Sequence, residues 1–162
     1  MKKTLFIIMV ALSFSLTTKA QEIYSEIRKF ASEHVNNPAE NELVKKINRF
    51  ELDALDYMGM KMKEVMPDTT ATFLDDQAYA LYTYINLYSR TLVDISTQPK
   101  AYQIKVIRLF MDASYSNPLF NDPDKDIVLS YFSNGDSITR FSLDTDWRRA
   151  LAAVLQEIKK IQ

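Results

Sequence analysis

Apolar and polar residues follow a helical period along most of this 162-residue chain. In four long segments, apolar residues recur every three to four positions, the spacing that places them on one face of an α-helix. A fifth segment shows the clearest stripe, formed by Trp147, Leu151, Val154, Ile158 and Ile161. The pattern predicts five helices, over residues 22–35, 38–66, 72–95, 100–113 and 147–161.

Capping signals accompany three of the predicted helix starts. Asn37 followed by Pro38 is typical of an N-cap and a first helical position. Thr72, with an acid three residues later, is predicted to cap the third helix. Asp144 or Thr145 is predicted to cap the last one. The third helix is apolar most of the way round, which is typical of a central, buried helix.

Residues 123–143 fit two different structures. An Asn-Gly dipeptide flanked by strand-favouring residues is typical of a β-hairpin. Alternatively, Asp122 caps a short helix whose first position is Pro123. We favour the helix, over residues 123–133, with residues 137–143 extended.

These elements predict a mainly α protein in which residues 21–162 form one domain. The expected fold is a compact bundle of about five helices, with a short extra helix or a β-hairpin between residues 123 and 143. The length suits a single domain with its own hydrophobic core. Because the chain has no cysteine, packing rather than disulfide bonds must hold the fold together.

Residues 1–20 have the three-part pattern of a secretory signal peptide. Lys2 and Lys3 precede the apolar run "LFIIMVALSFSL", and small residues lead to Ala20. The run is shorter than the roughly 20 residues needed to cross a bilayer, and no comparable run follows. We therefore expect a secreted or periplasmic bacterial protein, with no lipid-modified cysteine and no membrane insertion after cleavage.

Composition argues against several classes of function. The chain has only two glycines, Gly59 and Gly135, so neither a P-loop nor a dinucleotide-binding turn can be built. The formal net charge is −1 and no cluster of Lys and Arg is present, which argues against nucleic acid as a partner. We therefore predict no cofactor and no nucleic-acid partner.

Three alternating aspartates, Asp122, Asp124 and Asp126, resemble the start of a calcium loop. The sixth and twelfth positions of such a loop would be Ile127 and Ser133, where a glycine and a carboxylate are required. The aspartates are instead predicted to lie at a helix start, where the macrodipole favours negative charge.

Asp75 and Asp76 lie at another predicted helix start. Adjacent residues on a helix diverge by about 100°, so these two acids do not face each other as a catalytic pair must. Glu51, Asp53 and Asp56 are predicted to lie on the solvated side of the second helix. We therefore predict no catalytic residue.

Soft metal ligands are few in this chain. Met58 and Met62 share a helical face while Met60 points away, which is more typical of core filling than of a copper site. His34 is the only histidine, and a zinc site with one histidine and no cysteine is uncommon. We predict no metal site.

Tyr79 and Tyr82, with Arg90 nearby, are the candidate ligand-binding residues. Tyrosine combines apolar area with a hydroxyl and is enriched at binding surfaces. Tyr84 and Tyr88 lie four residues apart and are instead predicted to pack inward.

Two hypotheses for function follow from these patterns. The leading one is a non-enzymatic helical module that binds another protein or a small ligand through an apolar or tyrosine-bearing surface. The alternative is a small hydrolase of the cell envelope that uses two carboxylates as acid and base. The alternative requires two acids that converge in a pocket, one of them with a raised pKa.

Overall fold

The computed structural model describes residues 22–68, 70–134 and 137–161. It is mainly helical with a small two-stranded antiparallel sheet, which confirms the predicted fold class. The elements, in chain order, are α1 (Glu22–Asn36), α2 (Glu42–Val65), α3 (Ala71–Asp94), α4 (Lys100–Tyr115), α5 (Lys125–Val128), β1 (Leu129–Asn134), β2 (Ser137–Ser142) and α6 (Trp147–Ile161).

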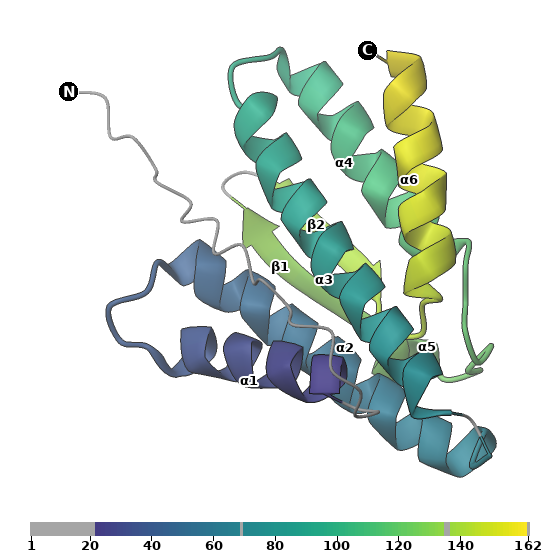
Figure 1. Ribbon diagram of the computed structural model, residues 1–162. Coiled ribbons are helices and arrows are strands. Elements are labelled where there is room, and N and C mark those ends of the chain that lie inside the picture. The colour runs from purple at the N-terminus through teal and green to yellow at the C-terminus, as the bar shows by residue number, and fades with distance from the viewer. Residues whose placement is uncertain (1–21, 69, 135–136, 162) are drawn as a thin grey trace.

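Two helix pairs and a hairpin surround the central helix α3 (Figure 1). α1 packs along α2, and α4 packs along α6, while α3 contacts all four of these helices. β1 packs against α2 and β2 packs against α4, so the hairpin bridges the two helix pairs. In the described part of the chain, no helix is both long enough and apolar enough to cross a bilayer.

Aromatic side chains form the centre of the core. The ring of Trp147 on α6 is fully buried, with its centroid 5.3 Å from that of Tyr84 on α3 and 5.9 Å from that of Phe50 on α2. Phe141 of β2 lies 5.2 Å from Phe50, so one cluster joins three helices to the hairpin. Aromatic pairs of this kind contribute about 0.5–1.5 kcal/mol beyond their buried area. Tyr84 and Tyr88 are both fully buried, which confirms their predicted inward packing.

The strands of a hairpin begin at Leu129 and end at Ser142, so the favoured helix over residues 123–133 is wrong beyond the single turn of α5. α5 is a single turn, and β1 pairs antiparallel with β2 directly after it. Phe141 of β2 joins the aromatic core, and the buried Thr139 hydroxyl is hydrogen-bonded to a core tyrosine. Packing of this kind overrides the local helix signals, because strand formation depends on what the pleated face contacts. The prediction of an extended segment after the turn is confirmed by β2, while Gly135 lies outside the described residues.

The predicted cap of the second helix is wrong by four residues. Asn41, rather than Asn37, caps α2, and its side-chain oxygen accepts a hydrogen bond from the Leu43 N–H at 2.8 Å. Asn37 instead accepts from the Ala39 N–H at 3.0 Å and shapes the preceding turn. Asparagine is equally suited to turns and to helix caps. Asn37 therefore serves in the turn, and Asn41 serves as the cap.

The capping residues of α3 and α6 also differ from prediction. Thr70 rather than Thr72 occupies the N-cap position of α3. At α6, the side chain of Asp146 accepts a hydrogen bond from the backbone N–H three residues later, which is the role of a cap. The predicted caps, Asp144 and Thr145, bind backbone and side-chain groups of other segments instead. The path of the chain therefore decides which of three consecutive polar side chains meets the helix end.

Gly59 lies within α2 and faces the side chain of Tyr24 on α1. A Cβ atom at this position would lie 2.6 Å from Oη of Tyr24 on α1. That hydroxyl donates a hydrogen bond to the Leu55 carbonyl at 3.0 Å, which fixes its place. Glycine is therefore needed here to make room for a side chain of the neighbouring helix.

Candidate functional site

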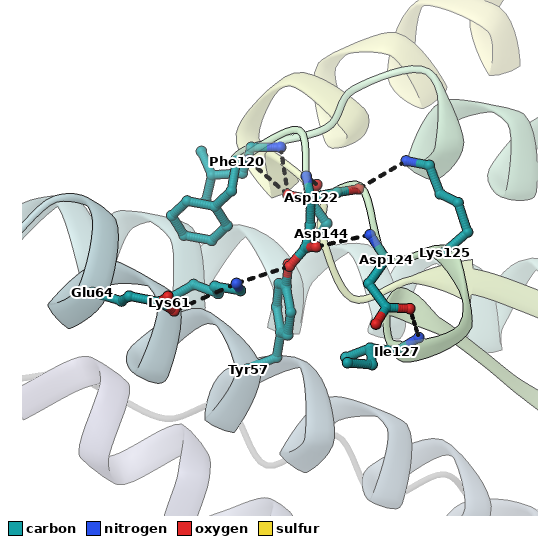
Figure 2. A network of polar contacts seen from close by, with 10 residues as sticks. Tyr57, Lys61, Glu64, Phe120, Asp122, Asp124, Lys125, Ile127 and Asp144 are labelled. Carbon is teal, nitrogen blue, oxygen red and sulfur yellow. Dashed lines mark hydrogen bonds and ion pairs between the residues drawn. The ribbon is translucent and has the colours of Figure 1, made fainter.

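Two acids of the loop region, Asp122 and Asp144, gather a dense set of polar contacts (Figure 2). The buried carboxylate of Asp144 accepts hydrogen bonds from the backbone N–H groups of Leu119 at 3.0 Å, Phe120 at 2.7 Å and Asp122 at 2.8 Å. A carboxylate that binds three amides in this way organises the loop that follows α4, because bonds to a charged acceptor are the stronger kind.

The Asp122 side chain binds two residues of α2. Its Oδ2 atom accepts a hydrogen bond from the Tyr57 hydroxyl at 2.9 Å and lies 3.0 Å from the Lys61 ammonium nitrogen, as Figure 2 shows. Its Oδ1 atom accepts from the Asp124 N–H at 3.0 Å. These contacts, the backbone N–H first and then Lys61 and Tyr57, lower the pKa of Asp122 to about 2. Burial and the bond to Asp122 raise the pKa of the Tyr57 hydroxyl.

This network holds structure together and lacks the features of an acid–base pair. A catalytic acid needs a raised pKa, whereas Asp122 is held ionised by its donors. Asp124 accepts a hydrogen bond from the Ile127 N–H at 3.2 Å, which fits the predicted helix-start role for this aspartate at the short helix α5. The side chain of Asp126 lies outside the described residues. Among the side chains that are described, no group of three or more His, Cys, Asp and Glu residues could hold a metal ion.

Asp75 and Asp76 are not brought together as a pair. Asp75 is buried, and its carboxylate accepts a hydrogen bond from the Tyr24 N–H at 2.9 Å, in the first turn of α1. Asp76 is exposed and lies 3.3 Å from Arg148 of α6. The predicted role of Asp75 at the start of its own helix is therefore wrong, because this carboxylate contacts the start of a neighbouring helix.

Glu51 is the acid that the sequence pattern misplaced. Its side chain is only 2% exposed, on the inner face of α2 rather than the predicted solvated side, whereas Asp53 and Asp56 are exposed as predicted. Burial raises its pKa to about 8, and Oε1 has no hydrogen-bond partner among the described residues. Glu51 lies four residues after Ile47 and four before Leu55, so its position on the apolar stripe was a usable signal.

The candidate residues Tyr79, Tyr82 and Arg90 lie along α3 without forming a cavity. Tyr79 is 51% exposed, and Arg90 is also exposed. Tyr82 is half-buried, with its ring centroid 6.2 Å from that of Phe30 on α1. None of the three lines either of the two grooves described below, so their role in ligand binding stays a prediction.

The methionines and the histidine lie where the periodicity indicates. Met58 and Met62 are buried in the core, while Met60 is exposed. His34, at the end of α1, has Nδ1 2.7 Å from a carboxylate oxygen of Glu40 in the turn before α2. This contact links the histidine to the turn between α1 and α2.

The solvent-facing side of the hairpin carries large apolar residues. Residues opposite each other in the antiparallel pair share a face, and Tyr131 lies opposite Arg140 while Leu129 and Ile138 lie two residues along from them. Tyr131 is 72% exposed, Ile138 54% and Leu129 40%. We call these four residues, Leu129, Tyr131, Ile138 and Arg140, the outer hairpin face. Sequence alternation in this segment was the available signal, but the helix interpretation concealed it.

Two neighbouring residues extend the outer hairpin face. Ile127 of α5, two residues before Leu129, is 58% exposed. Tyr115, at the end of α4, is also exposed, and the charge of Arg140 is close enough to lower the pKa of its hydroxyl, against a larger rise caused by burial. Exposed large side chains are therefore present on α4 and α5 as well as on the outer hairpin face.

A groove of about 480 Å³ lies beside β1. One wall is formed by Ser130 and Tyr131 of β1, and the other by polar residues of α2. The α2 side of the lining carries three basic and two acidic residues together with Phe50, namely Lys45, Lys46, Arg49, Glu42 and Asp53. Val35 of α1 is a further apolar member of the lining.

A larger, open groove of about 800 Å³ lies between α4 and α6. Its apolar lining includes Ile104 and Leu109, and its rim carries charges of both signs, from Lys105, Arg108, Lys160, Asp112 and Glu157. A balanced rim of this kind does not favour one class of charged ligand.

No protein-family model, curated protein or solved structure matches this chain. Function is therefore inferred from side-chain geometry, and the two surfaces with the most specific chemistry are the outer hairpin face and the groove beside β1.

Proposed function

We propose that the chain is an exported, non-enzymatic module that binds another protein through the outer hairpin face. The observation that carries this proposal is the exposure of Tyr131, at 72%, between Leu129 and Ile138 on one face of a two-stranded sheet. Export rests on the signal-peptide pattern of residues 1–20.

The composition of this face favours a protein partner. Tyrosine and arginine are enriched in protein–protein interfaces, and contiguous apolar area on a monomer is a common mark of a binding site. Exposure of the apolar side chains of Leu129 and Ile138 to water is unfavourable, because full burial of such a side chain contributes about 1.5–3 kcal/mol of free energy. A partner that covers them would obtain that contribution.

The roles of the acids weigh against the hydrolase alternative. Asp122 has a lowered pKa, Asp75 contacts a helix start, and Asp76 faces an arginine. Glu51 has a raised pKa but lines neither groove. Glu42 and Asp53 both line the groove beside β1, and burial raises the pKa of Asp53, but they lie eleven residues apart on α2, about 16 Å along the helix and farther than a catalytic pair allows.

Site-specific photo-cross-linking tests the proposal. A photoreactive amino acid replaces Ile138 in one variant and the similarly exposed Val93, at the end of α3, in a control. We expect a discrete adduct from extracts of the source cells only at position 138. The captured protein is then titrated against wild type, Ile138→Ser and Val93→Ser.

We expect Ile138→Ser to weaken binding about tenfold or more, because it removes a buried apolar contact worth a kcal/mol or two. Val93→Ser should bind like wild type. Equal cross-linking at both positions, or equal affinity of all three proteins, would overturn the proposal.

A further inference from the structure

The hydrogen-bond pattern of the hairpin identifies which backbone groups of β1 point away from β2. The Leu143 N–H donates to the Val128 carbonyl at 2.7 Å, directly beyond the pair Leu129–Ser142. Such a bond flanks a pair that exchanges no hydrogen bonds of its own. The N–H and C=O groups of Leu129, and of Tyr131 two residues later, therefore point to the free edge of β1.

The two edges of the hairpin differ in whether their outward backbone groups have hydrogen-bond partners. On the β2 edge, the outward N–H of Ser142 donates to the Ser114 hydroxyl of α4 at 2.9 Å. On the β1 edge, the described residues supply no such partner to the backbone of Tyr131. Natural proteins usually block an edge strand with proline, a bulge or an inward-pointing charge, and described β1 residues 129–134 include no proline or charged residue.

The groove beside β1 is lined by Tyr131 of this strand, and its far wall carries three basic and two acidic side chains, a net charge of +1. Lys46 and Arg49 are exposed and form no ion pair within 4.0 Å among the described residues, whereas Lys45 lies 3.1 Å from Glu42. Arg140 adds a positive charge opposite Tyr131 on the outer hairpin face. The free positive charges beside the edge are complementary to an acidic occupant.

We infer that an extended acidic segment of the partner protein adds to the free edge of β1 as a third strand. Main-chain hydrogen bonds to Tyr131 would supply affinity, and Lys46 and Arg49 would select acidic side chains at alternate positions. This inference rests on the proposed function and deepens it, since it specifies the form and charge of the bound segment.

The test uses a displayed library of random peptides of about twelve residues, enough to cover one strand. We expect wild-type protein to enrich proline-poor peptides with Glu or Asp at alternate positions. The strongest peptide is synthesised, and its binding is followed by fluorescence anisotropy and by amide exchange of the protein. Binding should protect the Tyr131 amide from exchange.

Two substitutions at one position isolate the edge contact. Tyr131→Ala and Tyr131→Pro both remove the ring, but only proline removes the outward N–H, and neither disturbs a bond to β2. We expect Tyr131→Pro to bind the peptide about tenfold more weakly than Tyr131→Ala at equal thermal stability. Equal affinities would overturn strand addition.

Charge reversal tests the contribution of Lys46 and Arg49. K46E/R49E should weaken peptide binding more than about tenfold, while K105E/R108E, the same change on α4, should leave it unaltered. Enrichment of basic peptides, or of none, would overturn the inference.

The two proposals fail in distinguishable ways. Suppose that Ile138→Ser weakens binding of the partner but the Tyr131 amide stays unprotected. Binding through the outer hairpin face would then stand, and strand addition would be ruled out. If Ile138→Ser leaves the affinity unchanged and the Tyr131 amide also stays unprotected, the proposed function is ruled out as well.

Discussion

The ammonium nitrogen of Lys61 lies 3.0 Å from Oδ2 of Asp122, and this ion pair joins the C-terminal part of α2 to the loop before α5. The same oxygen accepts the hydroxyl of Tyr57 from one turn earlier on α2. Two residues of one helix thus hold the carboxylate in its ionised form, and the loop is anchored where the hairpin begins.

Asp122→Asn should lower the urea midpoint of unfolding at pH 7. The folded pKa of Asp122 is about 2, below the ordinary 3.8, so the stability that it contributes is present above about pH 4 and is lost as the pH falls towards 2. The gap between wild type and variant should therefore close over that range. The exposed Asp68→Asn serves as the control and should change neither value. A gap of the same size at pH 2 and pH 7 would contradict the ion-pair account.

Asp144→Asn should destabilise the fold by about 2–4 kcal/mol at pH 7. The amide can offer only one oxygen, whereas the carboxylate uses both, accepting from Leu119 and Phe120 on one side and Asp122 on the other. Urea denaturation followed by circular dichroism measures the loss. The matched control is Asp94→Asn at an exposed position, expected within about 0.5 kcal/mol of wild type.

Glu51→Gln should change the pH dependence of stability. Because the folded pKa of Glu51 is about 8 and the ordinary value is 4.5, the folded state keeps a proton that the unfolded state releases. Wild type should therefore lose stability relative to the variant as the pH rises from about 4.5 to 8, at up to about 1.4 kcal/mol per pH unit. Thermal unfolding at several pH values measures this slope. The exposed Glu26→Gln should run parallel to wild type, and a parallel result for Glu51→Gln would show that Glu51 is ionised in the fold.

Gly59→Ala should destabilise the protein, although alanine within a helix normally stabilises by about 0.5–1 kcal/mol. The new Cβ would lie 2.6 Å from the Tyr24 hydroxyl oxygen. Tyr24→Phe removes that oxygen, so the double variant should be more stable than the sum of the two single changes predicts. A double-mutant cycle in urea measures this coupling, and additive effects would argue against the contact.

The helices were predictable because the apolar residues that form a stripe in each sequence segment are the residues buried in the fold. Trp147 and Val154 on α6, and Met58 and Met62 on α2, are buried where the period places them. The caps were not predictable from sequence, since Asn37 and Asn41 are chemically equal and only the path of the loop selects between them. Local signals thus located the helices, including the first residues of α1, α4 and α6, but not the capping residues.

The hairpin and the candidate site were harder to predict, for a different reason. Whether Phe141 belongs to a strand depends on the space left beside Phe50 and Tyr84, which other segments create. Glu51 was predicted on the wrong side of α2 because acidic side chains are usually exposed, and this expectation outweighed its position on the apolar stripe. The outer hairpin face and the open edge of β1 depend on strand pairing, so they become visible only once the register is known.

The location of Trp147 has a consequence for the order in which the molecule is assembled. Its indole fills the gap between α2 and α3, yet it is reached only after five helices and the hairpin have been synthesised. A nascent chain that ends before α6 would lack the indole at its centre, and the Gln77 side-chain oxygen would lack the backbone N–H of Trp147 that it accepts from in the fold. The native core is thus completed only by the last helix of the chain.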